Sequence, residues 1–430
     1  MYTPQRLFGE VGSSTDVLGH EPFLERARLQ REQEHDGSAR LALAAYVVAR
    51  LVDRLLTLDL DPAGMQSFHW QLEAVRRHLS ELPANAPETA HLLGVVQAIP
   101  QDGQRTPSLW MSLTAYAYFL EHEARLEESL EMLTLAARAQ GSDTTPSDFT
   151  AYALFAARLN RQLARWDGAK ECYAAAEECA ARLGEPMSML RGRLGRGAVH
   201  RGQGNYPAAR EIAESVLREA TALGLAEAQA LASSDLGVVY GALGLPLEAL
   251  QAHYRAFCLT ADRVEQMRTL GDLALGLRAI HAYEAARLAF QIVASSQARV
   301  LVRANALLEL MDLEASVGDR VSFERYRVAV EEFQSSMSPT MLVDYNYKLG
   351  MGFAQFGQTK RAQASLSTAL QLAEEHRLNA WYFKVEQALH TLANRGESTA
   401  APVEASPLSE APSIREIELG LREYAAAPAV

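Results

Sequence analysis

A period of 37 to 40 residues restricts this chain to a repeat architecture. Two stretches, LGRGAVHRGQGNYPAAREI and SDLGVVYGALGLPLEALQA, align at an offset of 40 residues and superimpose three pairs of small residues: Gly197 on Gly237, Gly204 on Gly244, and Ala209 on Ala249. A chain of 430 residues is longer than a single compact core usually grows. Stacked repeats that contact mainly their neighbours are therefore expected.

Extending the offset in both directions gives seven units, each with three marker positions. The first small position falls at Ala117, Ala157, Gly197, Gly237, Ala274, Met311 and Gly350. A turn position follows at Ala124, Ala164, Gly204, Gly244, His281, Gly318 and Gly357. A second small position follows at Ser129, Ala169, Ala209, Ala249, Ala286, Phe323 and Ala362. Small residues let two helices approach closely and glycine tolerates a tight turn, so each unit is predicted to be helix, turn, helix.

The sixth unit departs from this pattern, because Met311 and Phe323 occupy both of its small positions. We expect this unit to be splayed or shifted in register. In two other units Pro207 and Pro246 follow the turn, at the start of the second helix, where a missing N–H is tolerated.

These positions resemble the tetratricopeptide repeat (TPR) family over roughly residues 108 to 378, in its long-repeat bacterial-type subgroup of 37 to 40 residues. The resemblance implies an all-α, right-handed TPR-like helical-hairpin solenoid with an N-terminal helical cap and a disordered C-terminal tail. Members of that subgroup are transcription activators and peptide-sensing signalling regulators. The family's tryptophan is absent from most units, and the lysine and asparagine clamp of chaperone-binding members is not reproduced.

The chain divides into four predicted parts. Residues 1–20 form a flexible N-terminus, and residues 21–100 form an N-terminal helical region that is either a cap or degenerate repeats. Residues 101–395 form seven helix pairs plus a capping helix, and residues 396–430 form an acidic flexible tail with a short helix. Residues 396–412 are rich in Ser, Thr, Ala, Pro and Glu, which bury too little apolar area to order the backbone.

Composition argues against several classes of partner. A net charge of -12 disfavours nucleic acid, because phosphate neutralisation needs a basic face. The most apolar predicted helix carries Arg50, Asp53 and Arg54 at its middle, so no membrane span is expected.

Cys172 and Cys179 lie two turns apart on one predicted helix. Their separation is roughly 10 Å at 1.5 Å per residue, which is too far for a disulfide. Free thiols and the lack of a secretion signal predict a reducing, cytoplasmic setting.

No motif predicts catalysis or a cofactor. The glycine run from Gly192 to Gly204 has no preceding strand and no following lysine, so it is assigned to helix packing. The 11 histidines form neither an HExxH motif nor a zinc-type spacing with cysteine. An enzyme is therefore disfavoured, and neither a cofactor nor a metal is expected.

The family resemblance implies that the first helix of each pair lines a concave groove. The groove positions that it implies are Arg158, Arg161, Arg191, Arg201, Arg268, Arg278, Tyr118, Asn305, Tyr347 and Gln355. Arginine forks bind carboxylates bidentately, so an acidic peptide or an acidic C-terminus is the implied ligand. The alternative is an ordinary solvated face, since 37 of the 41 basic residues are arginine.

These inferences leave two functions open. The chain is predicted to be a protein-interaction scaffold, with a ligand-responsive signalling or transcription regulator as the alternative. The partner is an unidentified protein or peptide. A further candidate is the chain's own tail, whose Ile414, Ile417, Leu419 or Leu421, and Tyr424 form an apolar stripe at helical spacing that suits docking into the groove. An inert tail, or a helix that caps the last repeat, is the alternative there.

Overall fold

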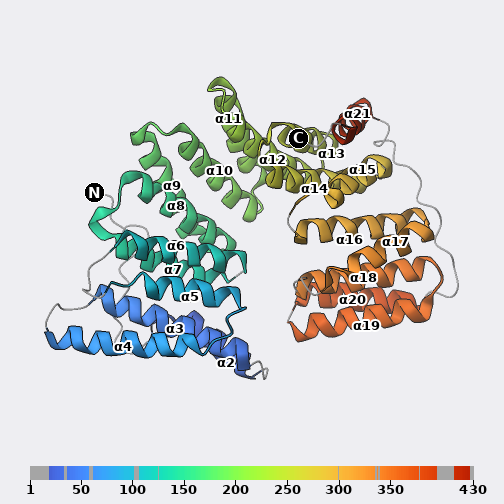
Figure 1. Ribbon diagram of the computed structural model, residues 1–430. Helices are drawn as coiled ribbons and strands as arrows, with labels where there is room; N and C mark the ends of the chain where they lie inside the picture. Colours follow the sequence, from blue (N-terminus) through green and yellow to red (C-terminus); the bar gives the residue numbers. More distant parts are fainter. Residues whose placement is uncertain are drawn as a thin grey trace. The chain divides into compact units, whose positions relative to one another are not determined.

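The computed structural model describes residues 19–32, 36–57, 62–100, 106–123, 125–298, 300–334, 337, 339–376, 378–394 and 411–426. Over these residues the secondary structure is helical throughout, without strands, and successive helices pair into hairpins (Figure 1). The predicted all-α, TPR-like helical-hairpin architecture is confirmed. The chain forms two compact units, residues 1–212 and 213–430, and each is described by itself.

The first unit begins with helices that precede the repeats: α2 (Glu21–Glu32), α3 (Asp36–Leu56), α4 (Pro62–Ser80) and α5 (Pro87–Gln97). The hairpins then follow as α6 (Pro107–His122) with α7 (Leu126–Gln140), a 3-10 turn η1 (Gly141–Asp143), and α8 (Pro146–Gln162) with α9 (Trp166–Leu183). The next two helices are α10 (Pro186–Gly202) and α11 (Tyr206–Ala222), and the boundary between the two units falls within α11. The N-terminal helical region predicted before the repeats is thus α2 to α5 in the structure.

The second unit continues the same alternation. Its hairpins are α12 (Ala226–Ala242) with α13 (Pro246–Leu259), α14 (Arg263–Ala279) with α15 (Tyr283–Ser295), α16 (Val300–Val317) with α17 (Arg320–Glu331), and α18 (Pro339–Gln355) with α19 (Thr359–Glu375). At the place of the capping helix predicted after the seven helix pairs, the structure has α20 (Asn379–Asn394). The final helix, α21 (Pro412–Ala426), matches the short helix predicted in the tail, whereas residues 395–410 and 427–430 lie outside the described residues.

The backbone turns left-handed at six of the seven predicted turn positions. Their φ angles are 55° at Ala164, 76° at Gly204, 74° at Gly244, 64° at His281, 81° at Gly318 and 70° at Gly357. Ala124, the seventh, lies outside the described residues. The helix–turn–helix prediction is therefore confirmed at these positions. Ala164 and His281 hold this conformation without the freedom of glycine, which costs energy because Cβ crowds the backbone there.

Replacing Ala164 by glycine should raise the free energy of unfolding by about 0.5–1 kcal/mol, because the left-handed strain of the side chain is removed. The matched control is Ala151→Gly, at an exposed interior position of α8, where the same substitution should lower stability by about the same amount. Chemical denaturation of both variants gives the comparison. Equal destabilisation by the two glycines would contradict the assignment of strain to the turn.

The small positions permit close helix contact. A Cβ added at Gly197 would lie 3.2 Å from Ile212 Cγ2, one at Gly237 would lie 2.5 Å from the His253 ring, and one at Gly350 would lie 2.7 Å from Leu366. Where serine fills a small position, at Ser129, its hydroxyl donates to the carbonyl of Ala117 across the hairpin at 2.7 Å. The predicted reason for these small residues is confirmed.

The expectation of a splayed or shifted sixth unit is wrong. Its turn residue Gly318 has the predicted left-handed φ of 81°, and both Met311 and Phe323 are fully buried. The volume of Phe323 is accommodated by the next hairpin, where Gly352 leaves room: a Cβ there would lie 2.4 Å from the Phe323 ring. The aromatic rings of Phe353 and Phe356 complete the contact, with centroids at 5.7 and 5.3 Å.

Candidate functional site

On the first helices of the first unit, Arg158 of α8 is already paired with a carboxylate. Its guanidinium donates through Nε and Nη2 to the two carboxylate oxygens of Glu121 on α6, at 2.6 and 2.8 Å. The same guanidinium lies over the ring of Phe155 at 4.8 Å, and Tyr118 of α6 stacks on that ring at 4.2 Å. Two of the predicted residues, Arg158 and Tyr118, therefore meet in one aromatic and ionic cluster between α6 and α8.

Three further predicted arginines of this unit lie on α8 and α10. Arg161 is half-buried, and its Nε has no hydrogen-bond partner within the described part of the chain. Arg191 is exposed and Arg201 is half-buried, both on α10.

In the second unit, charged side chains join three consecutive first helices. Arg278 of α14 donates to Glu309 of α16 at 2.5 Å and to Asp312 of the same helix. Lys348 of α18 donates to Glu309 at 2.5 Å and to Asp344 at 2.7 Å. These five residues form what we call the ion-pair ladder. Burial alone would lower the pKa of Lys348, but the charges of Glu309 and Asp344 outweigh it and raise the pKa, which keeps the ammonium charged.

The other predicted residues of this unit have separate surroundings. Arg268 pairs within its own helix, with Glu265 at 2.8 Å and Asp272 at 3.2 Å. Tyr347 packs edge-on against Trp381 of α20 at 5.8 Å, with the Lys384 ammonium 4.4 Å from its ring centroid, and burial raises the pKa of Tyr347. The remaining two, Asn305 and Gln355, are half-buried on α16 and α18.

The six arginines are not all open to an acidic ligand. They divide between the two units, and Arg158, Arg268 and Arg278 each have carboxylate partners within the chain. A carboxylate ligand at these three sites would have to displace an existing ion pair. The binding role assigned to the predicted groove residues stays a prediction.

Sequence reasoning missed a row of exposed apolar residues on the first helices. In the second unit, the residue directly after the first small position is Val238 in α12, Leu275 in α14 and Met351 in α18, and each is 37% to 45% exposed, whereas Asp312 holds this position in α16. We call Val238, Leu275 and Met351 the first-helix row. The sequence contains this pattern, because each residue directly follows an aligned small position. Aligning the small residues alone does not show that the residues beside them are apolar and exposed.

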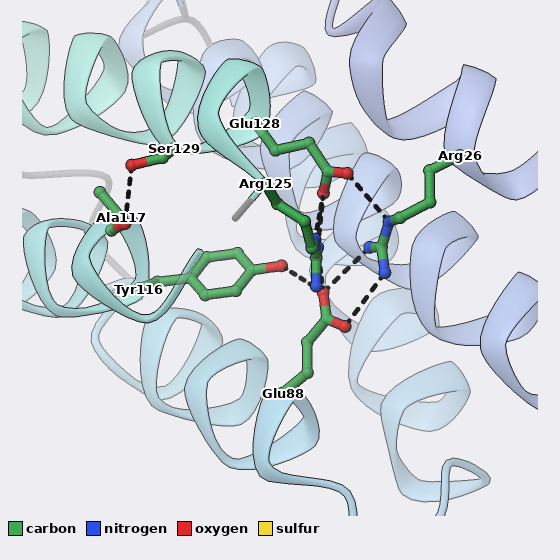
Figure 2. Close-up of polar contacts among 7 residues, drawn as sticks. All are labelled: Arg26, Glu88, Tyr116, Ala117, Arg125, Glu128 and Ser129. Atoms are coloured by element: carbon green, nitrogen blue, oxygen red, sulfur yellow. Dashed lines mark hydrogen bonds and ion pairs between the residues drawn. The ribbon is translucent and has the colours of Figure 1, made fainter. Parts of the chain in front are cut away.

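A buried polar network links the N-terminal helices to the first hairpin (Figure 2). Glu88 of α5 accepts hydrogen bonds from Arg26 of α2 at 3.0 and 3.2 Å, from Tyr116 of α6 at 2.7 Å and from Arg125, the residue before α7, at 2.7 Å. Glu128 of α7 pairs with Arg26 at 3.0 Å and with Arg125 at 2.5 Å. Two guanidinium groups and two carboxylates balance one another, so we assign this network to fixing the N-terminal helices rather than to binding.

The two carboxyl groups of this network respond differently to burial. Burial tends to raise the pKa of Glu88, but hydrogen bonds and charge from Arg125 and Arg26 outweigh it and leave the pKa lowered. For Glu128 burial prevails over the same two arginines, and the pKa is raised. Burial also raises the pKa of Tyr116 well above its ordinary value, so its hydroxyl stays protonated and donates to Glu88.

The described residues contain no group of three or more His, Cys, Asp or Glu side chains placed to hold a metal ion. Among the helices that the structure describes, none is both long and apolar enough to cross a membrane. Cys172 and Cys179 are buried and Cys258 is exposed, and all three are free thiols.

Comparison with known proteins gives likenesses among solved structures. No family model matches the sequence, and no curated protein matches it. The chain is similar to the apo form of RapI, with a TM-score of 0.46 and 11% identity over 77% of this chain and 98% of that one. It is similar to NprR in complex with its cognate peptide NprX, with a TM-score of 0.43 and 15% identity over 86% of this chain and 96% of that one. The apo form of the quorum sensor NprR from B. thuringiensis gives a TM-score of 0.43 and 13% identity over 87% of this chain and 97% of that one. These likenesses assign no activity to the chain.

Proposed function

We propose that this protein is a non-catalytic scaffold that binds a protein or peptide segment on the face formed by the first helices of its second unit. The first-helix row is the observation that carries the proposal. Single exposed apolar residues are common on protein surfaces and need no explanation. Large apolar residues that recur at one register position on α12, α14 and α18 are different, because packing of the hairpins leaves them partly exposed each time.

Geometry suggests the kind of segment that would bind. Packed helices lie about 8–10 Å apart, and an extended peptide advances about 3.3 Å per residue. Because α14, α16 and α18 pack in succession, an extended segment that crosses them would place apolar side chains about six residues apart on Leu275 and Met351, on either side of Asp312. In the second unit the neighbouring ion-pair ladder holds three carboxylates against two cations, so we propose that this segment is apolar with basic rather than acidic flanks.

The test uses a displayed library of random 12-residue peptides, selected on the full chain and then labelled for binding measurements. Val238→Lys with Leu275→Lys should weaken binding of the selected peptides at least tenfold, because two apolar contacts are lost and two charges are introduced on the proposed face. The matched control is Val321→Lys with Val328→Lys, two exposed apolar residues on α17, a second helix, which should change affinity less than twofold.

Two outcomes would count against the scaffold proposal. The first is a library that yields no enriched peptide at all. The second is a set of enriched peptides that bind the first-helix variant as tightly as the α17 control variant, with both variants retaining the helical circular dichroism of the unsubstituted chain.

A further inference from the structure

The C-terminal helix α21 is seated on the second helices of two consecutive hairpins. It contacts α13 and α15, and Figure 1 shows it beside them. Three apolar residues on one face of α21, namely Ile414, Ile417 and Leu421, are 2% exposed or less and join the core cluster that contains Phe257 and Phe290. Leu419, on the opposite face, is exposed. Of the two alternatives that the sequence left open for the stripe, Leu421 is thus the buried member, together with Ile414 and Ile417, and Leu419 is not.

The surface beneath α21 also provides polar contacts to the end of that helix. The hydroxyl of Tyr424 donates to Gln266 at 2.9 Å and accepts from Arg263 at 2.5 Å, both in the first turn of α14. The Arg263 guanidinium lies 5.7 Å from the centre of the Tyr424 ring, and Phe257 of α13 meets that ring edge-on at 5.0 Å. These contacts fix the orientation of the helix as well as its position.

Gly420 sets how closely α21 approaches α13. A Cβ added at this glycine would lie 1.8 Å from the hydroxyl oxygen of Tyr254. Glycine in a helix interior disfavours the helix itself, so the residue is explained by the contact and not by local structure. Any side chain at this position must push α21 away or displace Tyr254.

The location differs from the one predicted for the tail. The sequence suggested docking into the arginine-bearing groove of first helices, whereas α21 lies on second helices through apolar and tyrosine contacts. Residues 395–411 connect α21 to α20. Because α21 belongs to the same chain as this surface, its local concentration there is raised, so weak intrinsic affinity is sufficient to keep the helix in place.

We propose that the surface formed by α13, α15 and the first turn of α14 is a helix-docking site, with α21 as its exchangeable occupant. Its ligand class is an amphipathic helix with apolar residues at the spacing of Ile414, Ile417 and Leu421 and a glycine opposite Tyr254. A helix of that class, presented by another molecule, replaces α21 at this surface. The site is separate from the first-helix row, and does not depend on it.

The test adds a labelled peptide of residues 411–426 to two full-length proteins. In the first protein, Gly420→Leu prevents the chain's own α21 from docking and leaves the surface open. In the second protein, the unsubstituted chain, α21 competes with the peptide for the surface. The peptide should bind the Gly420→Leu chain at least tenfold more tightly than the unsubstituted chain. A peptide that itself carries Gly420→Leu should bind neither chain measurably.

Hydrogen exchange on the full chain supplies the companion measurement. Gly420→Leu should remove the protection of residues 411–426 while leaving α13 and α15 protected, and the exposed-face control Leu419→Ala should leave all three helices protected. Ile417→Glu, which disables α21 without touching Tyr254, should reproduce the effect of Gly420→Leu. Three results would overturn the proposal: equal binding of the peptide to both chains, no binding to either chain, and unchanged protection of α21 in the variants. Val238→Lys with Leu275→Lys should leave the peptide result unchanged, which separates this site from the first-helix face.

Discussion

Replacing Glu88 by alanine should lower the free energy of unfolding by about 3–5 kcal/mol, because the substitution leaves Arg26 and Arg125 buried with fewer compensating charges. Glu88 and Tyr116 lie inside the protein, and the carboxylate receives four hydrogen bonds from three residues. Chemical denaturation gives the overall change. Hydrogen exchange should show that backbone amides lose protection first in α2 and α5, which the network attaches to the first hairpin.

The control for this prediction is Glu127→Ala on α7, which breaks an exposed ion pair with Arg165 and should cost less than about 1 kcal/mol. The pH dependence supplies a second check. Because the pKa of Glu88 is lowered in the folded protein, its ion pairs stabilise the fold above the ordinary carboxyl pKa and lose that effect as the pH falls. The stability difference between the unsubstituted chain and Glu88→Gln should therefore be larger at neutral pH than near about pH 4. A difference that is independent of pH would contradict the assigned charge.

The second large effect concerns the packing of Phe323 into the space left by Gly352. Phe323→Ala should lower the free energy of unfolding by about 3–5 kcal/mol, because a fully buried ring is removed from between two hairpins. Gly352→Leu alone should also be strongly destabilising, since even a Cβ would lie 2.4 Å from that ring. Combining the two substitutions moves side-chain volume from one hairpin to the other. The loss of stability in the double variant should therefore be smaller than the sum of the two single losses by at least about 1 kcal/mol.

A helix-interior glycine with open space around it supplies the control. Gly271→Ala in α14, where an added Cβ would meet nothing within 4 Å, should leave stability unchanged or raise it by up to about 1 kcal/mol. Strictly additive effects of Phe323→Ala and Gly352→Leu would show that the ring does not occupy the space above Gly352.

The period of the sequence predicted the hairpins well, because the features that define a hairpin lie within one unit. Gly204 and Gly318 could be placed in turns from spacing alone, and both have left-handed backbones. The sixth unit was misjudged for the opposite reason. The residue that makes Phe323 acceptable, Gly352, belongs to the following hairpin, so no inspection of a single unit reveals it.

The candidate site was less predictable because its side chains act in pairs across neighbouring repeats. Arg158 and Arg278 were visible as charges on first helices, but the carboxylates that pair with them, Glu121 and Glu309, lie 37 and 31 residues away. Those separations are close to the repeat period, so comparing charges between adjacent units would have found them. The contact surface of α21 was beyond such reasoning, because the tail has no counterpart in the repeat from which to infer a position.

The buried network around Glu88 also has a consequence for the order in which the molecule is made. Glu88 lies 62 residues after Arg26 but 28 and 37 residues before Tyr116 and Arg125, so its shell is completed only when α7 begins. During synthesis, a chain that ends between α5 and α6 has one of the two arginines that this carboxylate requires. Helices α2 to α5 therefore do not constitute an independent folding module, since their last polar contacts are supplied by the hairpin that follows them.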